Sequence, residues 1–489
     1  MPVRPYDQRK MFLLPPCLDE WVRADHPARV VSDIVDHLDV SEFRTVHHEG
    51  RPCFAPRMML KVLLWGYANG VRASRKLAER LGADVVFMWL AGMEQPDFRT
   101  ICLFRRNNPA ALKRLFAQVL GIARDMGLCQ LGLVALDGTK VRASAGINSF
   151  KRPAEWQKEL TRLEEEIQRM LDEAEAQDRA DDAAYGEDRR GDELPKELEQ
   201  KQARVKKIKE ILAEAERRGD KKALMSSTDI DAGYMHGPAG SLPAYNAQVA
   251  VNEHQMIVYA EVTTEPVDVN QVGPALAGIE ETTGRKPEQF LADAGYRSGP
   301  NLRLLEDERV DGYIPETGEK HIGRTARRDS EQYGREAFRY DREHDCYRCP
   351  AGQTMTRTSE RRSKTKYSEQ TKRIYRPPRG VCLACPRKAQ CTVSNNLLGR
   401  SISRDDYEEE RTRMRQKLGT EEGKTVYGRR KCLVEPAIGQ LKVIGGFRQF
   451  LLRERQGAGI EWKWMTTALN LLKMSWKVLS GEAKLAWAT

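Results

Sequence analysis

The strongest constraint on the fold is a series of short apolar segments between residues 131 and 315. Five of these segments are bounded by turn residues and rich in β-branched side chains, which predicts strands over LGLVALD, YNAQVAVN, MIVYAEVT, PEQFLAD and VDGYIP. Helical spacing occurs between the later strands, in DVNQVGPALAGIEETT and NLRLLEDE. Strands in succession, followed by alternation of strand and helix, predict an α/β domain in which helices pack on a mixed sheet.

A helical region precedes this domain. The segment PRMMLKVLLWGYA has helical apolar spacing, Gly70 interrupts it, and SRKLAERL resumes with Ser74 as the expected N-cap. Further along, Asp97 is placed to cap FRTICLFRR, and Pro109 to open the next helix. We therefore predict an N-terminal all-α domain over residues 1–128. It is either a DNA-binding domain with a helix-turn-helix or an ordinary helical domain.

A highly charged stretch interrupts the α/β domain at residues 151–222. Apolar residues recur there at alternating fours and threes on both sides of a polar break: Trp156, Leu160, Leu163, Ile167 and Met170, then Leu198, Val205, Ile208, Leu212 and Ala215. This spacing predicts an inserted antiparallel helical hairpin. Its mixed charges are more typical of solvated helix faces than of a nucleic-acid contact. The α/β core then comprises residues 129–150 and 223–315, and the helices of residues 426–489 complete it.

The overall charge favours a polyanionic partner. The 489 residues carry a formal net charge of +10 with 31% charged side chains, which points to nucleic acid more than to a membrane. The first residues, MPVRPYDQRK, lack the apolar run of a signal peptide, and MMLKVLLWGYA is short and broken by Lys61. We therefore expect a cytoplasmic protein that is associated with the nucleoid and not with a membrane.

Two aspartates follow predicted strands. Asp137 closes LGLVALD before Gly138, and Asp293 closes QFLAD before Ala294. An Asp-Gly dipeptide taken alone is a common turn. In α/β sheets, however, chemistry gathers at strand ends, and two carboxylates there with a third from a helix make an oxygen cage for hard divalent cations. The candidate for the third carboxylate is Glu435.

Glu435 lies in the segment TVYGRRKCLVEPAIGQLKVIGG, for which we expect a helix. At about 100° per residue, Tyr427, Lys431, Gly439 and Lys442 fall within about 80° of Glu435. One face would then show a carboxylate between two lysines beside an aromatic ring. Basic groups that flank a metal-binding acid suit a phosphodiester substrate. The alternative is an i, i+4 surface pair of lysine and glutamate.

Together these motifs resemble the Asp-Asp-Glu site of bacterial insertion-sequence transposases. The resemblance is carried by LVALDGTK, FLADAGYRS and YGRRKCLVEPAIGQLK, in this order, and extends from PDFRTICLFRR to EWKWMTTALNLLKMSW. It implies an RNase H-like catalytic fold and a DDE transposase. Two Mg²⁺ ions, replaceable by Mn²⁺, would be held by Asp137, Asp293 and Glu435. They would support endonucleolytic hydrolysis at the element ends and transesterification of the freed 3′-hydroxyl to target DNA.

The resemblance also implies the partners. These are double-stranded DNA, as transposon ends and target, and a second copy of the chain in a homodimeric synaptic complex. Two alternatives remain open: an RNase H-fold nuclease without strand transfer, and a domesticated sequence-specific DNA-binding protein. The intact set of three acids argues against the second.

The third family motif reads Y-x2-R-x3-E-x6-K, and the chain departs from it at one position. Tyr427 and Lys442 have the family spacing, but Arg430 lies one residue too far from Glu435, and Lys431 has that spacing instead. Helical geometry favours Lys431, because Arg430 would point about 140° away from Glu435. A kink at the following proline could shift this register. Tyr427, Arg430, Lys431 and Lys442 are all candidate DNA contacts.

A cysteine-rich insertion occupies residues 316–425. Half of the chain's 10 cysteines lie in DCYRCPAG and CLACPRKAQC, a pattern of paired C-x2-C motifs that indicates metal binding. The expected ligands are Cys349, Cys382, Cys385 and Cys391, with Cys346 as a substitute for any of them. We predict structural zinc. The alternatives are an iron-sulfur cluster and unligated thiols.

Between the two cysteine pairs lies the basic segment TRTSERRSKTKYSEQTKRIYRPPRG, in which Tyr367 and Tyr375 are interleaved. Such a composition suits phosphate contact and base stacking, although a solvated loop has it too. The candidate DNA contacts here are Arg361, Arg362, Lys364, Lys366, Lys372 and Arg373.

Overall fold

The computed structural model describes residues 17–45, 52–185, 196–219, 223–237, 240–316, 333–364 and 369–487. Six helices come first: α1 (Pro27–Asp36), α2 (Pro56–Ala68), α3 (Ser74–Leu81), α4 (Val85–Ala91), α5 (Phe98–Asn107) and α6 (Pro109–Asp125). Asp97 caps α5 by accepting a hydrogen bond from the Thr100 amide at 2.7 Å, and Pro109 opens α6, as predicted. Ser74 instead occupies the first turn of α3, which has Ala73 as its N-cap.

The main sheet is mixed, which confirms the α/β prediction. Its strands are β1 (Leu133–Arg142), β4 (Gly233–Gly237), β5 (Gly240–Asn252), β6 (Ile257–Thr263), β7 (Gln289–Leu291) and β8 (Asp311–Tyr313). They follow the order β4-β5-β1-β7-β8, and β6 also pairs with β5. β5 is antiparallel to β1, β4 and β6, whereas β1, β7 and β8 are parallel to one another. α9 (Val272–Thr283) leads from β6 to β7, and α10 (Gly299–Asp307) connects β7 to β8.

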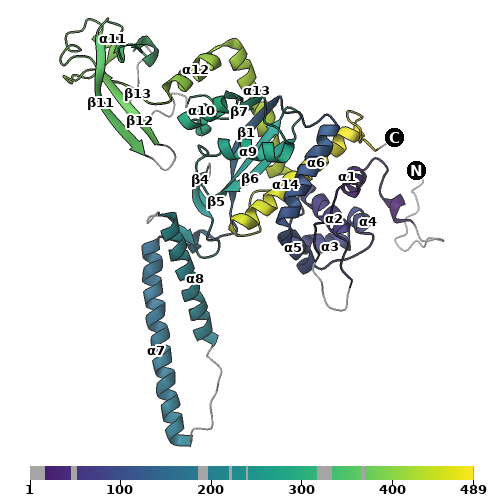
Figure 1. Cartoon of the computed structure of the whole chain (residues 1–489). Coiled ribbons are helices and arrows are strands. Elements are labelled where there is room, and N and C mark those ends of the chain that lie inside the picture. The colour runs from purple at the N-terminus through teal and green to yellow at the C-terminus, as the bar shows by residue number, and fades with distance from the viewer. Residues whose placement is uncertain are drawn as a thin grey trace, which may run out of the picture.

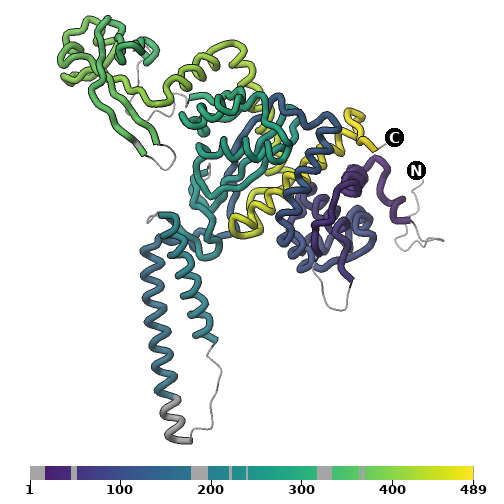
Figure 2. The backbone as a smooth tube through the Cα atoms, viewed as in Figure 1, coloured from purple at the N-terminus to yellow at the C-terminus, as the bar shows by residue number. Residues whose placement is uncertain are grey.

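One long helix near the C-terminus joins the sheet to the N-terminal helices. α14 (Glu454–Leu479) packs against α1, α2 and α6 on one side and β6 on the other. Its tryptophans Trp462 and Trp464 are fully buried in this packing. Figure 2 shows this yellow segment passing between the purple N-terminal helices and the teal sheet. The described part of the chain includes no helix that is both long and apolar enough to cross a membrane.

A pair of long helices projects from the sheet (Figure 1). α7 (Pro153–Tyr185) and α8 (Lys196–Arg218) pack along their length, and β2 (Phe150–Lys151) pairs with β3 (Met225–Ser226) at their base. The helices share a narrow apolar seam that includes Trp156 and Ile208. Ion pairs such as Arg204–Glu159 and Lys209–Glu164 connect them beside that seam. Some of the mixed charges on α7 and α8 thus form ion pairs that hold the two helices together.

A second sheet, which the sequence did not predict, contains the cysteine-rich region. Its strands are β9 (Arg339–Asp341), β10 (Cys346–Arg348), β11 (Thr354–Lys364), β12 (Glu369–Arg376) and β13 (Ile402–Arg404), all antiparallel. The short α11 (Lys388–Cys391) precedes β13, and α12 (Glu408–Gly419) and α13 (Glu421–Val443) lead back to the main sheet. Arg303 and Arg413 form ion pairs that join α10 to α12.

Candidate active site

Asp137 lies within β1 rather than at its end. The strand continues to Arg142 because β5 pairs with it, with Gly138 opposite Gln248. The Asp-Gly dipeptide therefore forms no turn. The pairing of β1 with β7 covers only residues 133 to 135, so it ends just before Asp137. Asp137 thus follows the point where β1 loses one of its two neighbours.

Asp293 occupies the equivalent position just after β7 (Gln289–Leu291). The two strands are parallel, and Ala135 lies opposite Leu291, so each aspartate follows its member of this pair by two residues. The carboxyl ends of parallel strands meet at the same edge of a sheet. The Asp293 carboxylate accepts a hydrogen bond from the Gly295 amide at 2.8 Å, which fixes its direction.

A guanidinium from α13 lies between the two carboxylates. Arg430 Nη2 is 2.9 Å from Asp137 Oδ2 and 3.8 Å from Asp293 Oδ2. The Arg430 side chain is only 9% exposed, and its Nε makes no hydrogen bond within the described residues. A buried guanidinium with an unused N–H donor beside an acidic cluster can donate a hydrogen bond to a phosphate oxygen.

The electrostatics of Asp137 differ from those of an exposed carboxyl. Burial raises the pKa of Asp137 to about 6, the charge of Asp293 adds to this rise, and Arg430 opposes it. The ionised form is therefore costly where it stands, and a further positive charge would stabilise it. Burial also raises the pKa of Tyr427, so that its phenol stays protonated and can donate a hydrogen bond at neutral pH.

A further carboxylate, which the sequence reasoning missed, lies beside Asp137. Asp268 Oδ1 accepts hydrogen bonds from Asn246 Nδ2 at 2.7 Å and Gln248 Nε2 at 2.8 Å, and Lys140 Nζ is 3.6 Å away. The negative charge of Asp268 also contributes to the raised pKa of Asp137. A signal was present in the strand YNAQVAVN, where Asn246 and Gln248 alternate with apolar residues. Both are fully buried and need a polar partner.

Gly138 makes room for this cluster. A Cβ at this position would lie 2.4 Å from Gln248 Nε2 and 2.7 Å from Asp268 Oδ1. A glycine inside a strand often marks such a close approach of other groups to the backbone. Asp137 therefore supplies an acid, and the absence of a side chain at Gly138 leaves the space that Gln248 and Asp268 occupy.

α13 presents two different faces. The helix passes Pro436 without interruption, with Arg430 on its buried face and Lys431 and Glu435 exposed. Lys431 and Glu435 do share a face, as the helical angle predicts, but that face is not the one that meets the aspartates. Burial lowers the pKa of the half-buried Lys442, while the charge of the nearby Asp137 acts in the opposite direction.

Two family models match the chain. Residues 16–107 match a family described as Transposase domain (DUF772), and residues 348–475 match one described as Transposase DDE domain. Both matched segments thus resemble transposase families, and the second resembles a transposase DDE domain. No curated protein and no solved structure matches the chain. The second matched segment contains Glu435, whereas Asp137 and Asp293 lie between the two segments.

The candidate site shows a pair of acids rather than a complete cage of three. Within the residues that the structure describes, no group of three or more histidine, cysteine, aspartate or glutamate side chains is arranged to hold a metal ion. Asp137 and Asp293 share one arginine, and Glu435 is exposed on α13. The site as it stands therefore pairs two carboxylates with a cation.

Four cysteines of the chain gather around one cavity in the second sheet, which we call the thiol cavity. Its lining includes the four expected ligands, Cys349, Cys382, Cys385 and Cys391. The proposed substitute, Cys346, is buried within β10 and lies outside this lining. All five are free thiols.

The β11–β12 pair, which we call the basic hairpin, carries five of the six predicted DNA contacts: Arg361, Arg362, Lys364, Lys372 and Arg373. Lys366 lies outside the described residues. Arg361 and Lys372 are opposite each other in register, and both are exposed. Arg373 forms an ion pair with Asp406 at 3.1 Å. The exposed cross-strand pair is thus the better candidate for contact with DNA.

Proposed function

We propose that this transposase cuts DNA at the ends of a mobile element and transfers the freed 3′-hydroxyl to target DNA. The main support is that Asp137 and Asp293 stand at the ends of the paired segments of two adjacent parallel strands, with Arg430 between them. The strand directions support an RNase H-like catalytic fold, because β6, β5 and β1 are antiparallel neighbours and β1, β7 and β8 are parallel.

Asp137 and Asp293 fit a hard divalent cation. Both offer carboxylate oxygens, the donors that Mg²⁺ and Mn²⁺ prefer. Burial raises the pKa of Asp137, so a cation beside it would relieve the cost of its charge. Two Mg²⁺ ions held by Asp137, Asp293 and Glu435 would stabilise the negative charge on the attacking and leaving oxygens of the phosphodiester.

We propose Glu435 as the third acid because of the motif in which it stands. It is exposed on α13, on a different face from the buried Arg430, and we propose that α13 turns or shifts to bring it to the aspartates when DNA binds. Asp268 competes for this role, since it already lies beside Asp137 and shares its electrostatic environment. Separate Glu435→Gln and Asp268→Asn variants distinguish the two, because the true third acid is the one whose loss abolishes cleavage.

The basic groups around the aspartates would hold the DNA backbone. Arg430 offers donors in a planar arrangement that suits phosphate oxygens, whereas Lys140 and Lys442 act as point charges. Tyr427 supplies a protonated phenol. Lys431 is exposed and would contact DNA farther from the scissile bond.

Contacts outside the catalytic site would supply most of the affinity for double-stranded DNA. The basic hairpin and the N-terminal helices are the proposed surfaces, and their phosphate contacts would be sensitive to salt. We further propose that two copies act together at paired element ends. Acting on cellular DNA, the transposase would work at the nucleoid in the cytoplasm.

Cleavage of DNA that carries the inverted repeats flanking the transposase gene tests this proposal. Asp137→Asn and Asp293→Asn should each lower Mg²⁺-dependent or Mn²⁺-dependent cleavage by about 100-fold or more, while end binding in a gel-shift assay stays intact. Asp307→Asn, on the exposed end of α10, is the matched control and should cleave normally. Normal cleavage by either active-site variant would remove that aspartate from the site.

A further inference from the structure

The second sheet has too small an apolar core to hold its long loops. Its buried cluster consists of Phe338, Tyr347, Met355, Tyr375 and Ile402. The loop between β12 and β13, residues 377–401, contains only the single-turn helix α11. Units with so little buried apolar area usually need a disulfide or a metal to keep one conformation. The cysteines here are free thiols.

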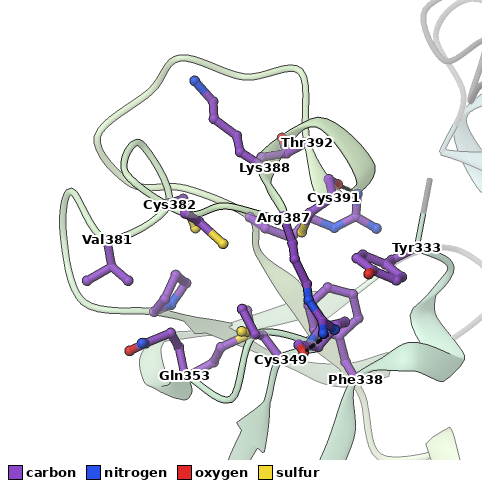
Figure 3. A pocket seen from close by; sticks show the side chains of 16 residues that line it. Tyr333, Phe338, Cys349, Gln353, Val381, Cys382, Arg387, Lys388, Cys391 and Thr392 are labelled. Carbon is purple, nitrogen blue, oxygen red and sulfur yellow. Dashed lines mark hydrogen bonds between the residues drawn. The ribbon is translucent and has the colours of Figure 1, made fainter. Parts of the chain in front are cut away.

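The thiol cavity lies where two segments of this unit meet. Cys349 comes from the turn that follows β10, and the other three lining cysteines come from the β12–β13 loop. Figure 3 shows Cys349 on one side of the hollow and Cys382 and Cys391 across from it. The cavity measures about 30 Å³, which is room for one ion or for one or two water molecules.

The backbone on both sides holds these thiols in tight turns. The Cys349 amide donates to the Gln353 carbonyl at 2.9 Å, and Gly352, with a φ of +79°, donates back to the Cys349 carbonyl at 2.8 Å. On the opposite side, a Cβ at Gly399 would lie 2.5 Å from Cys382 Sγ. The chain therefore packs directly against the Cys382 thiol, and only glycine fits there.

We propose that the four thiols of this cavity bind one zinc ion as thiolates. Sulfur donors from cysteine, two of them here in the C-x2-C turn of Cys382 and Cys385, are the ligands that structural zinc prefers, and four of them complete its tetrahedron. At Zn–S distances of about 2.3 Å the sulfurs would lie about 3.8 Å apart. The described thiols surround the cavity without being arranged as ligands, so binding draws the two segments inward around the ion.

The zinc ion would act as a structural crosslink. It joins the turn after β10 to the β12–β13 loop, and these two segments flank the strands of the basic hairpin. The ion therefore fixes the position from which the hairpin presents Arg361 and Lys372. A single ion fits the small cavity better than a cluster of several iron and sulfur atoms does.

Elemental analysis of the full-length protein, purified in reducing buffer without chelators, tests the proposal directly. We expect about one zinc per chain, falling to less than about 0.2 in Cys382→Ser and Cys391→Ser. Cys346→Ser is the matched control, because this thiol lies in the same sheet but outside the cavity lining, and it should keep its zinc. Iron in place of zinc, no metal, or equal loss in the control would overturn the proposal.

Cobalt substitution provides a measurement that does not depend on a variant's folding. Zinc is removed from the wild-type protein with a chelator, and Co²⁺ is added under nitrogen. Binding by four thiolates should give an intense sulfur-to-cobalt absorption in the near ultraviolet and the visible bands of a tetrahedral ion, and added Zn²⁺ should abolish both. Absence of these bands, or only the weak bands of an octahedral ion, would contradict ligation by the four thiols.

Discussion

At the scale of single residues, Arg430 determines the charge balance of the candidate site. Its guanidinium lies against Asp137 at 2.9 Å and lowers the pKa of this carboxyl, in opposition to burial and to the charge of Asp293. Without Arg430, two carboxylates would face each other with less compensation. The residue therefore favours the ionised form of Asp137 and supplies donors for a phosphate.

The first prediction compares Arg430 with its neighbour in sequence. Arg430→Ala should lower cleavage by about 100-fold, whereas the exposed Lys431→Ala should change it little. Because Arg430 lowers the pKa of Asp137, its removal raises that pKa, and the acidic limb of the rate profile should move to higher pH. The measurement is cleavage rate from pH 5 to 9 in both variants. A larger loss in Lys431→Ala would reverse our assignment.

Asp268 gives the second prediction. Asp268→Asn removes the negative charge that pairs with Lys140, while the amide oxygen can still accept hydrogen bonds from Asn246 and Gln248. Since the charge of Asp268 raises the pKa of Asp137, the variant should lower it and shift the acidic limb of the cleavage profile to lower pH. Its maximal rate should fall by about tenfold as the cluster rearranges. An unchanged pH profile would show that Asp268 has no influence on the site.

Local patterns in the sequence predicted the two aspartates, whereas the groups around them depend on tertiary structure. Asp137 and Asp293 close apolar strand segments, which sequence alone reveals. The contact of Arg430 depends on which face of α13 packs on the sheet, and motif spacing does not determine this. Asp268 lies in a loop, and it comes near Asp137 through hydrogen bonds to Asn246 and Gln248 on β5, the strand that pairs with β1.

At the scale of elements, the second sheet shows why a charged hairpin escapes prediction. β11 and β12 contain basic and polar residues at nearly every position, so they lack the apolar alternation that identifies a strand. Their cross-strand register and the small cluster around Tyr375 hold them together. The helices α7 and α8, in contrast, were predicted because their apolar spacing extends over many turns.

The third prediction concerns DNA binding by the basic hairpin. The double variant Arg361→Ala/Lys372→Ala removes an exposed cross-strand pair and should weaken DNA binding. The slope of log K against log salt should decrease by about 1.8, because each phosphate contact contributes about 0.9. Lys158→Ala/Lys207→Ala, an equal charge change on the exposed surface of α7 and α8, is the control. Equal slopes in the two double variants would exclude a specific role for the hairpin.

At the scale of the whole molecule, one buried ion pair fastens the N-terminal helices to the C-terminal part. Arg72 Nη1 lies 2.8 Å from Glu461 Oε1, and Arg72 also donates to the Gln449 and Gly446 carbonyls. Glu461 is fully buried and accepts hydrogen bonds from the Leu451 and Leu452 amides. The two segments matched by transposase families thus meet at α14, although they are far apart in sequence.

The fourth prediction tests this connection. Glu461→Gln leaves a buried guanidinium without its counter-charge and should lower the free energy of unfolding by about 3 kcal/mol. Glu281→Gln breaks the exposed pair with Lys113, which also joins the N-terminal helices to α9, and should have little effect. Urea denaturation followed by tryptophan fluorescence measures both. Similar losses in the two variants would contradict the importance that we assign to the buried pair.

Strand joining tests the central claim, that Asp137, Asp293 and their basic neighbours catalyse transposition. Full-length protein is incubated with Mg²⁺, an unlabelled plasmid and radiolabelled DNA that carries the element ends with a free 3′-hydroxyl. We predict that the label becomes covalently attached to the plasmid, and that Asp137→Asn gives no such product. Shortened labelled fragments without any joined product would contradict strand transfer and identify a nuclease, and binding without cleavage would identify a DNA-binding protein.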